Sequence, residues 1–451
     1  MLITLDKKSN NKLYLQVYNH IRYSIIDGTL NAGKKLPSIR KLAIDLGVSK
    51  TTIENAYNQL IMEGYIEGVE RSGFFVVKID DKDLILDKKQ IKPYPIKSTK
   101  YLNLGITDSV FNFKLWQKEI NRIISYYSDD LLISSSANGE DKLREEIINY
   151  TRKYRGLNAH KNQVIVGAGI QQLLGILINL IGSDSKVAYE HPGYDRVKYI
   201  LESYNIKTTP IEIGQNGLDI NNLNMTNAKV VYVSPSHQYP TGNIMTISKR
   251  LELIKWAQDN NNYIIEDDYN SILRYSGNPI PSLQGLSNGD NVIYFGSFST
   301  ILFPSLKISY MVLPPLLLEK FEQVKYKYSQ TASKIEQLAL ATFIENGEFE
   351  RHIRKIKKLY SKKNEIITEE ILKLNVLGLD IIDTKAGTHI LLEFNNENLL
   401  NIVKENANNL NYKLEKVIGD KNRMIFKYTG LSDFEIPLIM NKLFARAKRK
   451  L

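Results

Sequence analysis

The sequence predicts an α/β protein with a small N-terminal winged helix-turn-helix and a large domain built on a mostly parallel sheet. Three observations support this prediction. Residues 1–78 contain helical patterns around a Gly-Val-Ser turn, followed by a hairpin pattern. Residues 79–100 are rich in Asp and Lys and contain two prolines, which is typical of a semi-rigid linker. From residue 101 to residue 451, apolar runs of strand length alternate with helical patterns.

The composition is that of a globular protein that favours an anionic partner. The formal net charge of +11 attracts anions such as nucleic acid, although a lysine-rich surface would give the same value. The absence of cysteine excludes disulfides and thiol chemistry, so we expect a cytoplasmic protein. There is no run of eighteen apolar residues and no secretory pattern, so no membrane span is expected. The six histidines lack the spacing of metal ligands, and we expect no metal site.

Helices separated by a short turn are predicted in the first domain. Apolar residues recur at helical spacing over residues 12–27. Ser38 is placed to cap a short helix that ends at Gly47, and Ser49 is placed to cap a further helix over residues 50–63. A short helix, a Gly-Val-Ser turn and a second helix form the helix-turn-helix pattern.

The second helix of this pair has one apolar face and one polar face. Its apolar residues are Ile53, Ala56, Tyr57 and Leu60. Lys50, Thr51 and Thr52 are then free to enter a DNA groove, because threonine can read base edges and lysine contacts phosphates. The alternative is a small helical domain with a solvated polar face. After Gly64, two strand-like runs predict a β-hairpin that would form a wing.

The motifs of this domain are more specific than the pattern. They are Leu13-Tyr14-Leu15-Gln16-Val17-Tyr18, Leu36-Pro37-Ser38-Ile39-Arg40-Lys41-Leu42-Ala43, Leu46-Gly47-Val48-Ser49, Ala56-Tyr57-Asn58-Gln59-Leu60 and Glu63-Gly64-Tyr65-Ile66. Together they resemble a GntR-type winged helix-turn-helix, which implies binding to double-stranded DNA. The resemblance places near DNA the residues Ser38, Arg40, Ser49, Lys50, Thr51, Thr52, Arg71, Ser72 and Gly73. Arg40 could instead form a structural ion pair.

Five strand-like runs organise the large domain. They lie at residues 163–166, 186–190, 229–233, 262–266 and 291–295. Polar, aromatic or glycine residues follow each run, and open α/β sheets bind ligands at the carboxyl ends of their strands. The glycine-rich turn after the first run and the hydroxyl-rich segment after the last run both suit an anion such as phosphate.

Motifs of the large domain carry a second resemblance. They are Gly139-Glu140-Asp141-Lys142-Leu143-Arg144, Glu190-His191-Pro192-Gly193-Tyr194, Pro235-Ser236-His237-Gln238-Tyr239-Pro240-Thr241-Gly242, Glu266-Asp267-Asp268-Tyr269 and Gly296-Ser297-Phe298-Ser299. Over residues 101–450 they resemble the type I aminotransferase fold. With the GntR-type head, the whole chain resembles MocR-type regulators, whose best-known members respond to pyridoxal phosphate and an amino compound.

The resemblance implies a set of cofactor-binding residues. They are Tyr194, Tyr239, Asp267, Tyr269, Ser297, Ser299, Thr300 and Lys307. Tyr194 would stack on the pyridine ring, Asp267 would pair with the protonated pyridine nitrogen, and Tyr269 would hydrogen-bond the phenolic oxygen. Ser297, Ser299 and Lys307 correspond to phosphate contacts, although the family usually has arginine at the last position.

Three departures from the family pattern are expected to matter. The Schiff-base lysine aligns with Thr300, and a hydroxyl cannot form an imine, so pyridoxal phosphate could not be held as a lysine aldimine. The usual Ser-Gly-Thr of the phosphate loop is Ala168-Gly169-Ile170 here. The carboxylate-binding arginine aligns with Ile425, which leaves Arg423 as a weak substitute two residues earlier on the same strand face.

The sequence therefore predicts a DNA-binding transcription regulator and not an enzyme. The family implies a homodimer that binds a double-stranded DNA operator and senses a small-molecule effector in the aminotransferase-like domain. Two sensing modes stay open. Tyr194, Asp267 and Tyr269 favour non-covalent binding of pyridoxal phosphate or its amino-acid aldimine. Thr300 and the altered phosphate loop favour a different ligand or none, and slightly outweigh them. An active aminotransferase would need another amine in place of the missing lysine.

Overall fold

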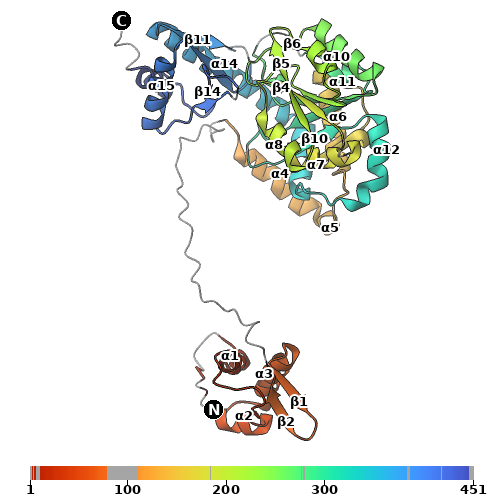
Figure 1. The fold of residues 1–451 in the computed structure, drawn as a ribbon, viewed down its shortest axis with the longest axis vertical. Helices are drawn as coiled ribbons and strands as arrows, with labels where there is room; N and C mark the ends of the chain where they lie inside the picture. Colours follow the sequence, from red (N-terminus) through yellow and green to blue (C-terminus); the bar gives the residue numbers. More distant parts are fainter. Residues whose placement is uncertain are drawn as a thin grey trace. The chain divides into compact units, whose positions relative to one another are not determined.

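The computed structural model divides the chain into two compact units, Met1–Ser98 and Thr99–Leu451 (Figure 1). The structure describes residues 3, 5–6, 11–78, 110–182, 184–275, 277, 280–382, 386–417 and 419–445. The linker predicted at residues 79–100 lies outside the described residues. Within the described part of the chain, no helix has the length and apolar character needed to cross a membrane.

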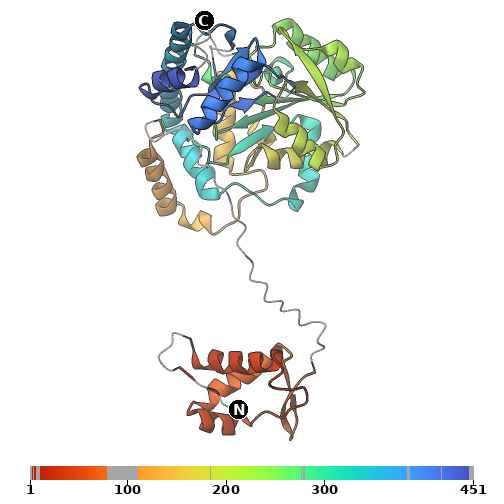
Figure 2. The same cartoon turned by 60° about the vertical axis from the view of Figure 1, so that its left-hand side comes forward.

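The described residues of the N-terminal unit form three helices and a hairpin (Figure 2). Its elements are α1 (Leu13–Ile26), α2 (Ile39–Leu46), α3 (Lys50–Met62), β1 (Ile66–Val69) and β2 (Gly73–Val76). The side chain of Ser38 caps α2 and that of Ser49 caps α3, each by accepting a hydrogen bond from a backbone N–H three residues later. Gly47 ends α2 in the left-handed conformation, at φ 61° and ψ 42°. The predicted winged helix-turn-helix is confirmed.

The core of this unit forms where α3 meets the other elements. Ile53, Ala56, Tyr57 and Leu60 of α3 are fully buried. The hydroxyl of Tyr57 donates a hydrogen bond of 2.9 Å to the carbonyl of Pro37, which ties α3 to the residues just before α2. The apolar face of α3 is thus used for packing, and its first turn stays on the surface.

The large unit contains an eight-stranded sheet in the order β3-β10-β9-β8-β7-β4-β5-β6. The strands are β3 (Val164–Gly167), β4 (Val187–His191), β5 (Thr208–Gly214), β6 (Gly217–Leu218), β7 (Val230–Val233), β8 (Tyr263–Asp268), β9 (Val292–Ser297) and β10 (Ser309–Val312). The five central strands, from β9 to β5, run parallel. β10 is antiparallel to both of its neighbours. The predicted mostly parallel sheet is confirmed, and the antiparallel β10 was not predicted.

Helices cover both faces of this sheet, because its strands alternate which side chains they send to each face. On one face, the core includes residues of α7 (Ile170–Ile181), α8 (Asp195–Ser203) and α12 (Pro315–Val324). On the other, it includes residues of α9 (Ile220–Asn224), α10 (Ile247–Asp259) and α11 (Leu283–Leu286). A further core cluster contains residues of α4 (Phe113–Tyr126), α6 (Asp141–Arg155) and α13 (Lys334–Glu345). The short helix α5 spans Ser128–Leu131.

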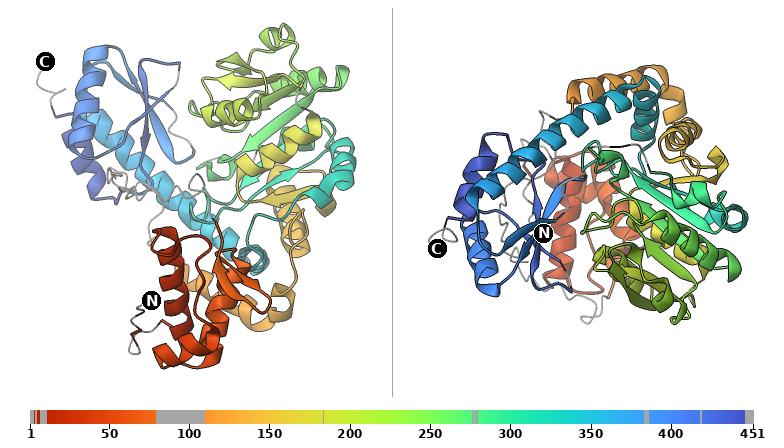
Figure 3. Two further views of the ribbon diagram at one scale, coloured as in Figure 1. Left: turned by 60° about the horizontal axis from the view of Figure 1, so that its bottom comes forward. Right: turned by 90° about the horizontal axis from the view of Figure 1, so that it is seen from above.

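The 27-residue helix α14 (Glu348–Leu374) leads from this layered region to a smaller C-terminal sheet (Figure 3). That sheet is antiparallel, in the order β11-β12-β14-β13. Its strands are β11 (Leu379–Ile382), β12 (His389–Phe394), β13 (Glu415–Lys416) and β14 (Arg423–Lys427). Two helices, α15 (Glu397–Asn409) and α16 (Glu435–Leu443), complete this part of the unit.

Candidate functional site

A cavity of about 610 Å³ lies in the large unit at the carboxyl ends of the parallel strands. All eight residues of the cofactor-binding set predicted from the sequence line it. They are Tyr194, Tyr239, Asp267, Tyr269, Ser297, Ser299, Thr300 and Lys307. These residues come from four separate segments of the chain, so only the fold brings them together. This cavity is hereafter called the main cavity.

Asp267 is a buried carboxylate on the wall of the main cavity. It lies near the end of β8, and its side chain is 4% exposed. The hydroxyl of Tyr232, on the neighbouring strand β7, donates a hydrogen bond to Oδ2 of Asp267. Oδ1 has no hydrogen-bond partner among the described residues. Burial raises the pKa of Asp267 to about 7, against the lowering effect of the Tyr232 hydrogen bond.

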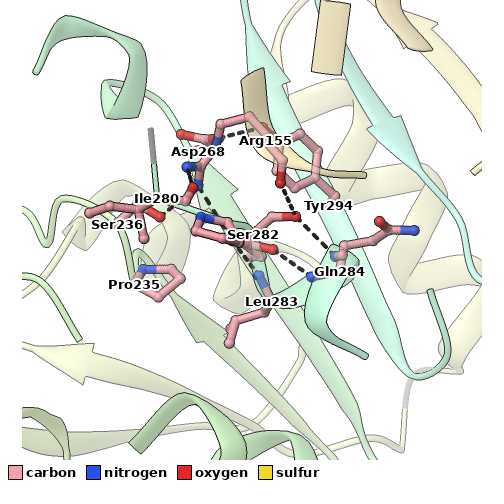
Figure 4. Close-up of polar contacts among 12 residues, drawn as sticks. Arg155, Pro235, Ser236, Asp268, Ile280, Ser282, Leu283, Gln284 and Tyr294 are labelled. Atoms are coloured by element: carbon pink, nitrogen blue, oxygen red, sulfur yellow. Dashed lines mark hydrogen bonds and ion pairs between the residues drawn. The ribbon is translucent and has the colours of Figure 1, made fainter. Parts of the chain in front are cut away.

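Side chains alternate along β8, so Glu266 and Asp268, the two acidic neighbours of Asp267, lie on the opposite face of the sheet. Figure 4 shows Asp268 and Arg155 within their polar contacts. Arg155, at the end of α6, donates from Nε to Oδ2 of Asp268 at 2.5 Å and from Nη2 to the hydroxyl of Ser236 at 2.6 Å. The carboxylate of Glu266 accepts the backbone N–H groups of Leu283 and Gln284, each at 3.0 Å. These contacts hold the end of β8 on the face of the sheet opposite Asp267. The position of Asp267 is therefore fixed through its chain neighbours Glu266 and Asp268.

One end of the main cavity has the donors that an oxyanion requires. The hydroxyl of Ser309 donates to Ser297 Oγ at 3.0 Å, and both residues line the cavity. Gly169, the N-cap of α7, lines the same cavity, and the positive end of a helix favours an anion. Lys307 is exposed and lines the same cavity. Thr300 lies in this region and has a half-buried side chain.

The turn that contains Ala168 and Ile170, where the family usually has hydroxyls, contacts a hydroxyl from another segment of the chain. The backbone N–H of Ala168 donates a hydrogen bond of 3.0 Å to the hydroxyl of Thr331, which comes from a distant part of the chain. One amide of the turn is therefore already satisfied within the protein. Gly169 has a φ of 103°, which a side chain would strain, so glycine is required there for the turn before α7.

Aromatic and charged side chains form the rest of the main cavity. The rings of Tyr194 and Tyr239 meet edge to face at 6.0 Å, and the ring of Tyr239 also lies 6.0 Å from that of Tyr269. Lys427 of β14 and Glu415 of β13 both line the cavity and form an ion pair of 2.8 Å. The cavity thus combines stacking surfaces with a charged pair.

Arg423, the weak candidate of the sequence, lies elsewhere. Its guanidinium pairs with Glu393 at 2.7 Å and with Asp420 at 3.4 Å, and it is not among the residues that line the main cavity. Ile425 packs in a small apolar cluster with Leu391. Lys427 shares a strand face with Arg423 and Ile425, since alternate residues of a strand share a face. Of these three residues, Lys427 is the one that lines the cavity.

The residues predicted to approach DNA are exposed or half-buried in the N-terminal unit. Arg40, Lys50, Thr51 and Arg71 are exposed. The alternative role of Arg40 as a structural ion-pair partner stays a prediction. Arg71 lies in the turn of the hairpin at a φ of 59°.

The remaining predicted DNA-contacting residues have structural roles as well. Ser38 and Ser49 use their hydroxyls as helix caps. The hydroxyl of Thr52 lies 2.8 Å from that of Ser49 and is half-buried. Ser72 and Gly73 lie at the start of β2 and are also half-buried. The exposed members of this set therefore lie at the start of α2, at the start of α3 and in the hairpin turn; they are Ser38, Arg40, Ser49, Lys50, Thr51 and Arg71.

Comparisons with known proteins agree with both units. Residues 13–76 match the gntR family of bacterial regulatory proteins, and residues 99–417 match aminotransferases of class I and II. The HTH-type transcriptional regulator YdeL of Bacillus subtilis is 38% identical over 86% of this chain and 85% of its own. MocR of Rhizobium meliloti, a probable rhizopine catabolism regulatory protein, is 30% identical over 87% of this chain and 84% of its own.

The chain belongs to the MocR-type group of GntR-type transcription regulators. PdxR of Corynebacterium glutamicum, a regulator of pyridoxine biosynthesis, is 28% identical over 86% of this chain and 85% of its own. The MocR-type assignment made from the sequence is confirmed, and so is the role in DNA-binding transcription regulation.

Solved structures support the fold of the large unit of this MocR-type chain. Kynurenine aminotransferase of Pyrococcus horikoshii aligns with a TM-score of 0.70 and 22% identity, over 82% of this chain and 99% of its own. An archaeal alanine:glyoxylate aminotransferase aligns with a TM-score of 0.69 and 20% identity, over 78% and 91% of the two chains. At this level of identity the likeness shows the fold alone.

Several residues of the main cavity were missed from the sequence. Arg196, Asn270, Ser309 and Lys427 line it, and none of them was predicted to do so. Lys427 could have been found, because it shares a strand face with the position of the missing arginine. Arg196 lies two residues after Tyr194, in the first turn of α8, where the sequence alone does not fix its direction.

Proposed function

We propose that this MocR-type regulator senses a small molecule that binds non-covalently in the main cavity and changes how the N-terminal unit binds its operator. The observation that carries the proposal is the unpartnered Oδ1 of Asp267, at the wall of a cavity lined by all eight predicted cofactor-binding residues. A buried carboxylate oxygen without a partner favours a ligand that brings a donor or a positive charge to that point.

The residues of the main cavity fit a pyridine ring that carries a phosphate. The ring nitrogen would meet Oδ1 of Asp267, and the ring would lie among Tyr194, Tyr239 and Tyr269. A phosphate would meet Ser297 and Lys307 near the N-terminus of α7. Pyridoxal phosphate has this chemistry and would also bring an aldehyde that captures amines. We therefore favour the first of the two sensing modes predicted from the sequence.

We further propose that the chain does not act as an aminotransferase. The resemblance places Thr300 at the position of the lysine that holds the cofactor in the enzymes, and a hydroxyl forms no imine. Lys307 and Lys427 also line the main cavity, but Lys307 belongs to the oxyanion end and Lys427 is paired with Glu415. Ligand binding would then serve as a signal and not as the first step of a reaction.

The operator would be read mainly by the first turn of α3 and the hairpin turn. Lys50 and Arg71 supply positive charge for phosphates, and Thr51 supplies a hydroxyl for a base edge. We propose a homodimer, since two copies of a winged helix-turn-helix would read paired half-sites of the operator. A cytoplasmic location follows from these proposed partners, because the operator is DNA.

A titration of the full-length chain with 4′-deoxypyridoxine 5′-phosphate tests the ligand part of this proposal. The probe has the ring nitrogen and the phosphate of pyridoxal phosphate but no aldehyde, so its binding requires no imine. We expect saturable binding by calorimetry, which weakens by about tenfold or more in Lys307→Met, because a charge-assisted phosphate contact is lost. Lys373→Met, which removes a lysine paired with Glu370 on α14, is the matched control. Failure of the wild-type chain to bind the probe would reject the pyridine-phosphate assignment.

A further inference from the structure

A second cavity, of about 300 Å³, lies beside the main cavity. Among the described residues, Asn270 is the one that lines both. It follows Tyr269, a residue of the main cavity, and precedes the short helix η2 (Ser271–Leu273). The two cavities therefore meet at a single side chain on the loop that leaves β8.

The carboxamide of Asn270 is buried and unsatisfied. The residue is 1% exposed, and neither Nδ2 nor Oδ1 has a hydrogen-bond partner among the described residues. Folded proteins rarely leave a buried donor and a buried acceptor unpaired on one side chain, because each has lost its hydrogen bonds to water. The buried, unpaired carboxamide of Asn270 thus favours a polar molecule in a cavity that this residue lines.

The other residues of the second cavity define the charge of such a molecule. Arg274 lines it, and no carboxylate is among the described lining residues. His237 also lines it, but burial lowers the pKa of its imidazole to about 3, so the ring is neutral near pH 7. The hydroxyl of Ser236 already accepts a hydrogen bond from Arg155, and that of Thr241 donates to Gln238 at 2.6 Å. Arg274 and Asn270, with Asn243 and Ser271 on the same lining, are then the groups that would select a ligand.

We propose that the second cavity binds a small carboxylate with a hydrogen-bond donor on the adjacent carbon, that is, a hydroxy acid or an amino acid. The carboxylate would lie between the guanidinium of Arg274 and Nδ2 of Asn270, since both groups donate. The adjacent hydroxyl or amino group would donate to Oδ1 of Asn270. This site shares Asn270 with the main cavity but uses none of the residues assigned above to the pyridine ring and the phosphate.

Calorimetry on the full-length chain with L-lactate tests the proposal. Propionate has the same carboxylate without the hydroxyl, and L-lactamide has the hydroxyl without the charge. We expect L-lactate to bind more tightly than either. Asn270→Leu replaces the carboxamide by an apolar group of similar size and should weaken L-lactate binding by about tenfold or more. Asn179→Leu, an exposed asparagine on α7, is the matched control and should bind L-lactate as the wild-type chain does.

Two further measurements keep the proposal falsifiable if Asn270→Leu fails to fold. Asn270→Asp preserves the shape of the side chain and places a negative charge against the ligand, so it should abolish L-lactate binding. Crystals of the wild-type chain soaked in L-lactate should show the carboxylate between Asn270 and Arg274. Ordered water alone at Asn270, equal binding of all three probes, or unchanged affinity in both Asn270 variants would each overturn the proposal.

Discussion

The hydroxyl of Tyr232 donates a hydrogen bond to Oδ2 of Asp267 and leaves Oδ1 of that carboxylate unpartnered among the described residues. The two side chains come from neighbouring parallel strands and lie on the same face of the sheet. One carboxylate oxygen is thus held by the protein, and the other is available to a ligand. This arrangement has a consequence for stability as well as for binding.

The stability of the large unit should fall as Asp267 ionises. Burial raises its pKa to about 7 from the model-compound value of 3.8, so the folded chain holds this proton more tightly than the unfolded chain. The stabilisation is complete below about pH 4 and is lost as the pH rises through about 7. Relative to Asp267→Asn, the wild-type chain should lose at most about 4 kcal/mol of unfolding free energy over this range.

Tryptophan fluorescence during urea unfolding measures this difference, because both tryptophans, Trp116 and Trp256, belong to the large unit. Tyr232→Phe is the companion variant. This variant lacks the hydroxyl whose hydrogen bond lowers the pKa of Asp267, so the fall in stability should move to higher pH. Curves for the wild-type chain and Asp267→Asn that run parallel from pH 4 to pH 8 would show that Asp267 is not the titrating group.

Thr300→Lys should create covalent attachment of pyridoxal phosphate. The new amine would stand on the wall of the main cavity, where Thr300 lies, and could form an imine with the aldehyde. We expect an imine absorption band in this variant and a pyridoxyl group on residue 300 after borohydride reduction, located by mass spectrometry. The wild-type chain should show neither. A borohydride-stable adduct on Lys307 or Lys427 of the wild-type chain would contradict non-covalent binding.

Lys50 and Thr51 should affect DNA binding in different ways. Both are exposed in the first turn of α3. Lys50→Ala should weaken binding to all duplexes and reduce the slope of log Kd against log salt by about one, since one phosphate contact is lost. Thr51→Ala should instead relax the preference among duplexes selected from a randomised pool. Fluorescence anisotropy at several salt concentrations separates the two effects. An unchanged salt slope in Lys50→Ala would show that Lys50 does not contact a DNA phosphate.

Arg155 should contribute strongly to the stability of the large unit. Its side chain is buried, and it pairs with Asp268 behind the main cavity. Arg155→Met leaves that carboxylate buried without its partner, so we expect a loss of about 3–5 kcal/mol of unfolding free energy. Arg152→Met, an exposed position on the same helix, should cost less than about 1 kcal/mol.

The double variant Arg155→Met with Asp268→Asn decides whether the pair is the cause. Removing both charges should restore part of the lost stability, since no uncompensated charge then remains in the core. Additive losses in the double variant would mean that Arg155 acts through its contacts with Ser236 and the carbonyl of Ile280 instead.

Local patterns in the sequence were sufficient to predict much of the fold. The strand-like run at residues 262–266 became β8, and the polar residues after it reached the cavity because carboxyl ends of parallel strands share one edge. The caps at Ser38 and Ser49 were predictable because N-caps depend on neighbours only three residues away. The antiparallel strand β10 was not, since its pairing with β9 and β3 is set by distant segments.

The chemistry of the cavity walls depended more on long-range packing. No local pattern relates Thr331 to the amide of Ala168, which lies 163 residues away in the sequence. Lys427 reaches the main cavity only because the C-terminal sheet presents that face of β14 to it. The unpartnered amide of Asn270 depends on what surrounds it, and an asparagine after a strand is more often a surface turn residue.

The affinity of the full-length chain for its selected operator, measured by anisotropy as pyridoxal phosphate is titrated, tests most directly whether the main cavity is the sensor. We predict that saturation changes the operator Kd by about fivefold or more, since coupling between two sites is typically about 5–150-fold. The change should disappear on dialysis, because no covalent bond is made. An operator Kd that stays constant while the main cavity fills would contradict the claim that this cavity is the sensor.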